Sequence, residues 1–376
     1  MKSFNIGDLN IKVPIIQGGM GVGISLSGLA SAVANMGGIG IISTVAIGLT
    51  NKNPIANYKT NNIETLRREI RKARELSMGV IGVNIMSVLT NFSDMVKTSI
   101  EEGIDIIFAG AGLPLDLPKY LQNGMKTKLV PIVSSGRAAS ILCDKWNQNF
   151  NYLPDAFVVE GPKAGGHLGF KADQLLSESN KLENLVAEVL KVTEMVKEKF
   201  NKIIPVIAAG GIYSGDDMYQ IMDKGASAVQ LGTRFVATEE CDASIDFKNA
   251  FIQAKEEDIE IIKSPVGMPG RTIFNQFLRE AIDGKRKPKF CNYNCIKSCN
   301  PKTTAYCIAD ALLQAYKGNL KDGFVFTGTN AGKIFEISTV SRVFAELKNE
   351  FEQAAELIKT KFNEAKNVIN NKLTEN

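Results

Sequence analysis

Eight short runs rich in valine and isoleucine recur along this chain, separated by segments whose apolar residues follow a helical period. The runs begin at residues 13, 39, 80, 104, 129, 156, 204 and 228, so five of the seven intervals measure 24 to 27 residues, the length of one strand–helix unit. Near-continuous apolar strands need cover on both faces. We therefore predict an α/β fold, a (β/α)8 TIM barrel rather than an open doubly wound sheet, with strands at Val13–Gln17, Ile39–Ser43, Val80–Ile85, Ile104–Ala109, Leu129–Ser134, Ala156–Glu160, Ile204–Ala209 and Ala228–Leu231.

The two longer intervals carry extra residues, Val45–Asn62 after the second run and Gly161–Lys181 after the sixth. Both insertions follow the C-terminal end of a strand, the face where TIM barrels hold their active sites. The amphipathic stretches between the runs predict helices at Ser27–Asn35, Ile63–Leu76, Phe92–Glu102, Arg137–Gln148, Leu182–Phe200 and Gly215–Lys224.

The pattern changes near Glu257, which suggests a barrel of residues 1–256 and a C-terminal lobe of residues 257–376. In this interpretation Ser264–Gly270 is a turn-rich linker and a cysteine-bearing segment follows it. Residues 344–373 are predicted to form one long amphipathic helix that docks on the barrel or on a second subunit, so a homodimer is one expectation. Its apolar residues, spaced by three and four, are Phe344, Leu347, Phe351, Ala354, Ile358, Phe362, Ala365 and Ile369.

Charge and composition exclude several classes of protein. The net charge is +4, from 44 Lys and Arg against 40 Asp and Glu, and the basic residues are dispersed, so we expect no nucleic acid as a partner. No uninterrupted apolar run reaches the roughly 18 to 20 residues of a membrane helix, and the N-terminus lacks a signal-peptide pattern. We therefore expect a cytoplasmic protein that acts on a small-molecule substrate, with no membrane partner.

Glycine is concentrated at the ends of the predicted strands. It removes the Cβ atom that would keep a flat or phosphorylated ligand from the backbone. The turns after the last two strands also offer free N–H groups, as in the common phosphate site of TIM barrels. No G-x-G-x-x-G or G-x-x-x-x-G-K-S/T motif supports a Rossmann or P-loop site. The glycine-rich ends are Gln17-Gly-Gly-Met-Gly21, Ala109-Gly-Ala-Gly112, Glu160-Gly161, Ala208-Ala-Gly-Gly-Ile212 and Gln230-Leu-Gly-Thr-Arg234.

The chain has a single histidine, His167, which lies in the insertion after the sixth strand. One histidine excludes a zinc site with two histidine ligands and a serine–histidine triad elsewhere. Imidazole is well suited to move protons near neutral pH, so His167 is the candidate general acid or base. The competing interpretation is a polar loop residue, and the nearby Lys163 receives no role.

Together these motifs resemble the nitronate monooxygenase (2-nitropropane dioxygenase) family. That family also includes FMN-dependent enoyl-acyl-carrier-protein reductases and NADH:quinone reductases. The resemblance covers roughly residues 10 to 350 and implies an FMN-binding TIM barrel with an added lobe. It is carried by Gln17-Gly-Gly-Met20, Gly82-Val-Asn-Ile85, Ala164-Gly-Gly-His-Leu-Gly169, Ala209-Gly-Gly-Ile212 and Gln230-Leu-Gly-Thr-Arg234.

The resemblance also implies roles for individual residues. Gly19 and Met20 would lie along the isoalloxazine ring of FMN, and Asn84 would hydrogen-bond the ring or its ribityl chain. Glu160 and Gly165 would face the edge of the ring, and His167 matches the catalytic histidine of the family. The ribityl and phosphate groups would be held by Gly210, Gly211, Gln230, Gly232 and Thr233.

One residue leaves the activity open between the branches of the family. Glu160 stands where the bacterial monooxygenases are associated with glutamine, and glutamate is associated with the reductases. We predict oxidation of alkyl nitronates with O2, and the alternatives are an enoyl-acyl-carrier-protein reductase or a quinone reductase that uses NADH or NADPH. From other classes, a flavin-free phosphate-binding barrel and a non-catalytic scaffold that binds a partner also remain.

Four cysteines gather near the start of the C-terminal lobe. Cys291, Cys295 and Cys299 are spaced C-x3-C-x3-C, and Cys307 follows. On a helix this spacing would place three thiols on one stripe, and a four-thiolate zinc or iron–sulfur site is one interpretation. Buried thiols and a redox disulfide are the others, and we assign no metal.

Overall fold

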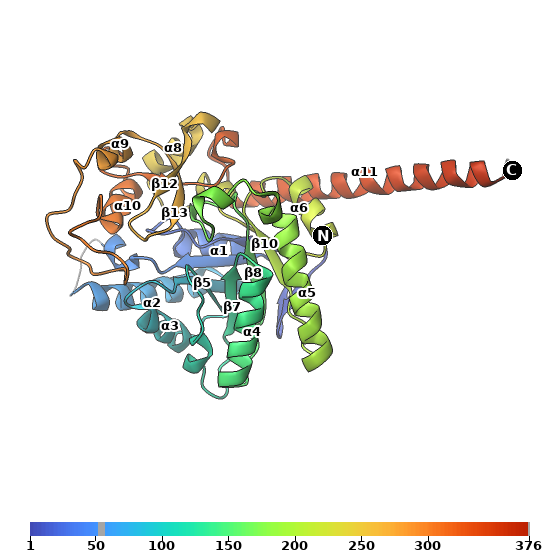
Figure 1. The fold of residues 1–376 in the computed structure, drawn as a ribbon, viewed down its shortest axis with the longest axis horizontal. Coiled ribbons are helices and arrows are strands. Elements are labelled where there is room, and N and C mark those ends of the chain that lie inside the picture. Colours follow the sequence, from blue (N-terminus) through green and yellow to red (C-terminus); the bar gives the residue numbers. More distant parts are fainter. Residues whose placement is uncertain (52–56, 375–376) are drawn as a thin grey trace.

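The computed structural model describes residues 1–51 and 57–374, with side chains as far as residue 361 in the last helix. Eight parallel strands close into a barrel in the order β10-β11-β3-β4-β5-β6-β7-β8, which confirms the predicted TIM barrel (Figure 1). Each lies within one or two residues of a predicted strand. They are β3 (Ile15–Gln17), β4 (Ile39–Ser43), β5 (Val80–Met86), β6 (Ile106–Gly110), β7 (Lys128–Val133), β8 (Phe157–Glu160), β10 (Val206–Ala209) and β11 (Ala228–Leu231).

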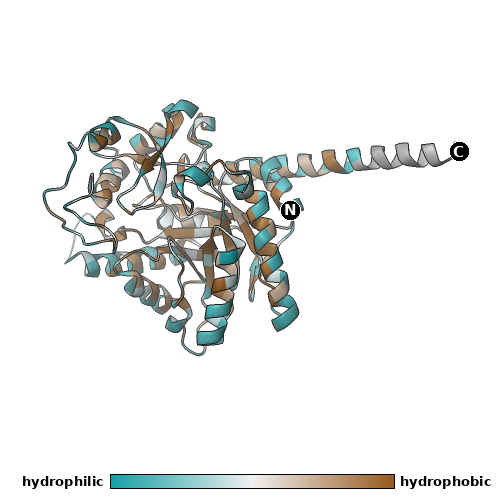
Figure 2. Ribbon diagram, in the orientation of Figure 1, coloured by the Kyte–Doolittle hydropathy of each residue, from teal (hydrophilic) through white to brown (hydrophobic). Residues whose placement is uncertain are grey.

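Helices follow the strands and cover the outside of the barrel, and Figure 2 shows largely brown strands surrounded by helices that alternate teal and brown residues. The six predicted helices are all present. Local sequence fixes where some begin: Ser135 accepts a hydrogen bond from the N–H of Ala138, and Ser214 with Asp217 forms a capping box. The helices of this layer are α1 (Ser27–Asn35), α2 (Tyr58–Leu76), α3 (Phe92–Glu101), α4 (Gly136–Phe150), α5 (Leu182–Phe200), α6 (Gly215–Asp223), α7 (Thr233–Val236) and α8 (Ile245–Gln253).

A hairpin before the barrel, β1 (Phe4–Ile6) and β2 (Leu9–Ile11), adds to the barrel interior. Ile6 and Ile11 are buried in one cluster with inward-facing strand residues such as Phe108. The ion pair of Asp8 with Lys128, the first residue of β7, places the hairpin near the N-terminal ends of the strands. The C-terminal ends of the barrel strands are therefore free of this hairpin and can hold an active site.

Between the barrel and the C-terminal helix lie three strands, β12 (Ile259–Lys263), β13 (Pro269–Ile273) and β14 (Val325–Phe326), and two helices, α9 (Gln276–Ile282) and α10 (Ile308–Tyr316). β13 also pairs with β9 (Gly166–His167) from the insertion after β8. Single 3-10 turns are η1 (Ile47–Thr50), η2 (Leu117–Tyr120), η3 (Ala172–Gln174), η4 (Glu178–Asn180), η5 (Glu256–Asp258) and η6 (Ala331–Lys333). The proposed division between residues 256 and 257 falls inside η5. β9 lies before this point and β13 after it, and the two strands pair in one sheet.

One expectation for this region is wrong, and the helix on which the cysteine stripe depended is not present. Ser264–Gly270 is not a linker: Ser264 N–H donates to the carbonyl of Met268 at 3.1 Å, closing the hairpin turn between β12 and β13. The segment from Cys291 to Cys299 forms turns and no helix, so its thiols do not form a helical stripe. Asn294 in this segment has a φ of +44°, which a continuing right-handed helix does not allow.

The predicted C-terminal helix is confirmed as α11 (Val340–Thr374). Its first half packs on the barrel, where Phe344 and Leu347 are buried and Phe351 meets Tyr219 of α6. Farther along, Leu357 and Ile358 are exposed, and the helix extends away from the barrel (Figure 1). The side chains of Phe362, Ala365 and Ile369 lie outside the described residues. Within the part that the structure describes, no helix is both long and apolar enough to span a membrane.

Candidate active site

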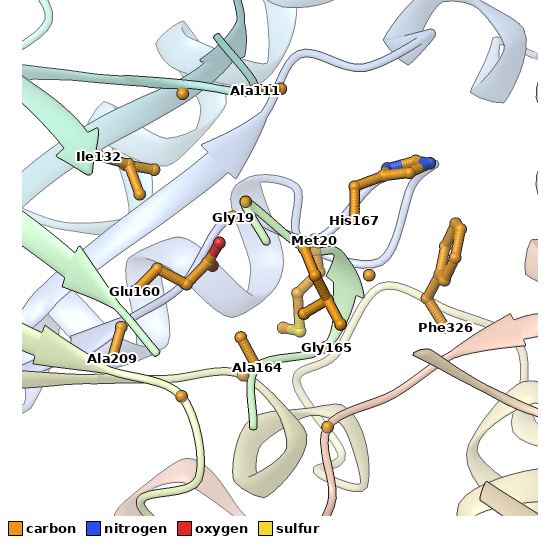
Figure 3. A pocket seen from close by; sticks show the side chains of 18 of the residues that line it. Gly19, Met20, Ala111, Ile132, Glu160, Ala164, Gly165, His167, Ala209 and Phe326 are labelled. Carbon is orange, nitrogen blue, oxygen red and sulfur yellow. The ribbon is translucent and has the colours of Figure 1, made fainter. Parts of the chain in front are cut away.

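A cavity of about 810 Å³ opens at the C-terminal ends of the barrel strands. The sequence predicted eleven site residues from five separate segments, and all of them line this one cavity. They are Gly19, Met20, Asn84, Glu160, Gly165, His167, Gly210, Gly211, Gln230, Gly232 and Thr233. Figure 3 shows Glu160, Met20 and His167 around the same space. Their individual roles remain predictions.

The end of β3 provides a glycine surface on one wall. A Cβ atom added to Gly19 would lie 2.3 Å from Cβ of Asn84, so only glycine allows the ends of β3 and β5 to approach this closely. Met20 lies beside Gly232, whose added Cβ would be 3.5 Å from the Met20 sulfur, an ordinary contact distance. Gly19, Met20 and Gly232 thus line the cavity where the ends of these strands come close together.

The turn after β10 has a backbone shape that favours glycine. Gly210 and Gly211 have φ angles of +96° and +87°, in the region that residues with a side chain rarely adopt. A Cβ on Gly211 would lie 2.8 Å from Cβ of Lys163. The turn is also tied to the C-terminal region, because Asn330 Nδ2 donates to the Gly211 carbonyl at 3.0 Å. Thr233, after β11, accepts a bond from Gly328 N–H at 3.3 Å.

Two buried oxygen atoms in the cavity wall have no hydrogen-bond partner among the described residues, Gln230 Oε1 and Ser43 Oγ. Leaving such a group unpaired costs about 1–3 kcal/mol. The amide oxygen can accept a bond from a ligand N–H, and the hydroxyl can donate or accept one. Unpaired polar atoms of this kind fit a heterocyclic ring with polar edges, which is the form of a flavin.

His167 is held by residues of the C-terminal region. It pairs with Gly270 of β13, and its Nε2 lies 2.7 Å from Oγ of Ser264. Its ring centroid is 4.9 Å from that of Phe326, with the planes inclined at 59°. Burial lowers the pKa of His167 to about 4, because the surroundings solvate imidazolium poorly. The imidazole is therefore neutral at physiological pH.

Arg271 fixes the loop that carries His167. Its Nη1 donates to the carbonyls of Pro162 and Ala164 at 2.8 and 2.5 Å. The side chain is buried, and this burial lowers the pKa of the guanidinium. A charged group bonded to two carbonyls of one turn restricts how that turn can move.

Glu160 ends β8 and lies in the cavity wall. Burial raises the pKa of its carboxyl to about 7, so both protonation states are populated near neutral pH. A carboxyl group with this pKa can exchange a proton with a ligand in the cavity.

Sequence reasoning missed four contributors to the site: Ser43, Ser264, Arg271 and Asn330. Ser43 is the last residue of a predicted strand, which was a usable signal. The other three come from the region after the barrel, where no periodic pattern shows which residues turn back to the barrel mouth. Ser264 begins the turn-rich segment Ser264–Gly270, which the sequence predicts to be a linker.

A TIM barrel with a glycine-lined cavity at its strand ends and one histidine on a loop has the form of an enzyme that holds a planar cofactor. The family model for nitronate monooxygenase matches residues 2–350, so the chain belongs to the nitronate monooxygenase family, whose members are flavin-dependent oxidoreductases. This confirms the resemblance seen in the sequence.

Relatives and solved structures similar to this chain carry several names. A Staphylococcus saprophyticus protein named "Probable nitronate monooxygenase" is 28% identical, with 73% of this chain and 79% of that protein covered. An octahydro-indene carboxyl-CoA dehydrogenase of Mycobacterium tuberculosis is 27% identical, with 75% of this chain and 69% of that protein covered. The structure of FabK from Thermotoga maritima matches with a TM-score of 0.71 at 29% identity, with 93% of this chain and 96% of FabK covered. Nitroalkane oxidase from Streptomyces ansochromogenes shares the fold, with a TM-score of 0.71, 20% identity and coverage of 93% and 98%.

Proposed function

We propose that this protein binds FMN in the cavity and oxidises alkyl nitronates with O2. The neutral imidazole of His167 in the cavity wall is the observation that carries this proposal. A neutral imidazole can accept the α-proton of a nitroalkane and so form the nitronate that is then oxidised, whereas a substrate supplied as the nitronate needs no base. The imidazolium formed in that step would lie beside an anionic product, which offsets the cost of a buried charge.

The residues of the cavity fit FMN in both its parts. Gly210 and Gly211 leave the backbone after β10 open to a phosphate or ribityl group, and Thr233 adds a hydroxyl. Asn84 would hydrogen-bond the ring or its ribityl chain, and Gln230 would help to hold the ribityl and phosphate groups. When bound, the flavin supplies a centre that accepts electrons from the substrate and passes them to O2.

Ser264 and Arg271 both position His167 in this proposal. Ser264 bonds the imidazole directly, and Arg271 bonds two carbonyls of the loop before it. Both residues hold the ring at a fixed distance from the substrate space. Proton transfer depends steeply on such positioning.

Reduction of an enoyl thioester by NADH or NADPH is the second candidate. Glu160 favours it, because a carboxyl with a pKa of about 7 can donate the proton that completes reduction of a double bond. The similarity to FabK and to a carboxyl-CoA dehydrogenase supports this candidate as well. Reduction of quinones would need the same reductant.

Anaerobic mixing of the purified flavoprotein with one reductant at a time separates these activities. We expect propyl nitronate to bleach the flavin absorbance rapidly. With nitroethane, which must first lose its α-proton, we expect slower bleaching that His167→Asn slows further. Fast bleaching by NADH or NADPH, followed by turnover of crotonyl thioester and no reaction with propyl nitronate, would reverse the order. A colourless protein that does not take up added FMN would favour the flavin-free barrel or the scaffold.

The cellular setting is also part of the proposal. We propose a cytoplasmic protein with a small-molecule substrate, in keeping with six cysteines that form no disulfide. The exposed Leu357 and Ile358 on α11 support a homodimer, which light scattering of the purified chain would test.

A further inference from the structure

A short segment after β14 joins three turns at the rim of the active-site cavity. Thr329 N–H donates to the carbonyl of Lys163, in the turn after β8, at 3.3 Å. The residues on either side of Thr329 bond the Gly211 carbonyl after β10 and the Thr233 hydroxyl after β11. The backbone of Lys163 is thereby held beside the two turns to which the ribityl and phosphate groups of FMN are assigned.

The side chain of Lys163 lies across Gly211. A Cβ atom added to Gly211 would be 2.8 Å from Cβ and 3.0 Å from Cδ of Lys163. The ammonium is two bonds beyond Cδ, so it too lies close to the glycine turn. Lys163 lines the cavity, as do the next two residues, Ala164 and Gly165 (Figure 3). The lysine stem therefore packs on the glycine, and its charged end is available to a ligand there.

Positive charge is scarce in the cavity. Among the described residues that line it, the ionisable side chains are Glu160, Lys163, His167 and Lys171. The imidazole is neutral at physiological pH, so the cations are the two lysines. Lys171 stands at the start of η3, and none of its atoms is among the nearest neighbours of a Cβ added to Gly211. Lys163 is thus the lysine of the cavity that lies beside the glycine turn.

Other basic residues near this turn are engaged elsewhere. Arg234 forms an ion pair with Glu346, and its guanidinium lies 4.7 Å from the ring centroid of Tyr213. Nζ of Lys333 lies 5.4 Å from the centroid of the same ring. Neither residue lines the cavity. The ammonium of Lys163, in contrast, has no ion pair or hydrogen bond with any residue that the structure describes.

We propose that the ammonium of Lys163 pairs with the phosphate of FMN at the turn after β10. This inference rests on the proposed FMN site and supplies a charge that the glycine turns lack. A phosphate monoester carries between one and two negative charges near pH 7. Backbone N–H groups are neutral donors, and a hydrogen bond with both partners charged is about twice as strong as a neutral one.

Riboflavin has the ring and ribityl chain of FMN without the phosphate, so the two flavins together isolate this contact. We expect the full-length wild type, stripped of flavin, to bind FMN more tightly than riboflavin when titrated by flavin fluorescence. Lys163→Met keeps a stem on Gly211 and removes the charge. It should weaken FMN binding by about 5- to 20-fold and change riboflavin binding by about twofold at most, less than the full value of a charged bond because Lys163 is exposed.

Two further variants serve as controls. Lys163→Arg keeps a positive charge that can bond phosphate, and it should retain the preference for FMN. Lys171→Met removes the other lysine of the cavity and should leave both affinities unchanged. Added salt screens an exposed charge. It should therefore weaken FMN binding more in the wild type than in Lys163→Met.

The outcomes separate this inference from the proposed site on which it rests. Equal FMN affinities in the wild type and Lys163→Met would overturn the role of Lys163 and leave the FMN site in place. Equal losses for FMN and riboflavin would also overturn it, because they would show a disturbed turn. The same FMN loss in Lys171→Met would show general attraction of an anion. A wild type that binds neither flavin would overturn both the site and the inference.

Discussion

Nε2 of His167 lies 2.7 Å from Oγ of Ser264, although 97 residues separate the two in the chain. Ser264 Oγ also accepts a bond from Val266 N–H at 3.2 Å, so the turn that carries it is fixed. The hairpin of the C-terminal region thereby orients the single imidazole of a barrel loop. Barrel and appended region together form one active site.

Ser264→Ala should lower kcat/KM by about 2- to 10-fold, because a typical net hydrogen bond is worth about 0.5–1.5 kcal/mol. FMN content should not change, since Ser264 is predicted to touch the histidine and not the flavin. Ser264→Thr keeps the hydroxyl and should restore most of the rate. Steady-state kinetics of both variants check this, and equal losses in the two would assign Ser264 to turn stability alone.

His167→Asn should slow substrate-dependent flavin reduction by about 10²- to 10⁴-fold, the usual contribution of a general acid or base. Because burial lowers the pKa of His167 to about 4, the wild-type rate should fall only as the pH approaches that value. Stopped-flow traces from pH 4 to pH 8 measure both effects. A wild-type profile that drops near pH 6.5, the ordinary value for histidine, would contradict the buried neutral state.

The barrel could be predicted because its pattern is local and repeated. The predicted strands Ile39–Ser43 and Ala228–Leu231 and the helix Leu182–Phe200 coincide with β4, β11 and α5. Each is a run of residues whose burial follows from its own period. The glycine-rich strand ends located the cavity for the same reason, since strand ends of a closed parallel barrel meet at one rim.

The rest depended on contacts between segments distant in the sequence. β9 has two residues and pairs with β13, so no periodic signal could place His167 beside Ser264. Arg271 resembles any basic residue until its carbonyl partners are known. The cysteine spacing permitted a helix, but the bonds to Val88 and Thr90 hold that segment as a loop. Tertiary contacts thus overrode the local pattern at these positions.

Gly211→Val should abolish FMN binding. Gly211 has a φ of +87°, and an added Cβ would lie 2.8 Å from Cβ of Lys163, in the turn predicted to hold the phosphate. Gly124→Val is a matched control, because Gly124 has a φ of +88° with nothing within 4 Å of the added Cβ. Absorbance ratios after desalting report bound flavin. Full FMN in a folded Gly211→Val protein would place the phosphate elsewhere.

Glu160→Gln should change how the stability of the FMN-free protein depends on pH. Burial raises the pKa of Glu160 from 4.5 to about 7 in the folded state, so the folded protein binds more protons than the unfolded chain between these values. The free energy of unfolding therefore falls as the pH rises from about 4.5 to 7, and the penalty persists above pH 7.

The amide variant carries no such penalty. It should match the wild type at pH 4.5 and exceed it by about 1–3 kcal/mol at pH 8, since one pKa unit is worth about 1.4 kcal/mol and solvent in the cavity reduces the full effect. Urea unfolding at both pH values measures the difference, with Glu183→Gln as an exposed control. If the free energy of unfolding depends on pH in the same way for the wild type and Glu160→Gln, the carboxyl is ionised in the folded protein and cannot serve as the acid of a reductase.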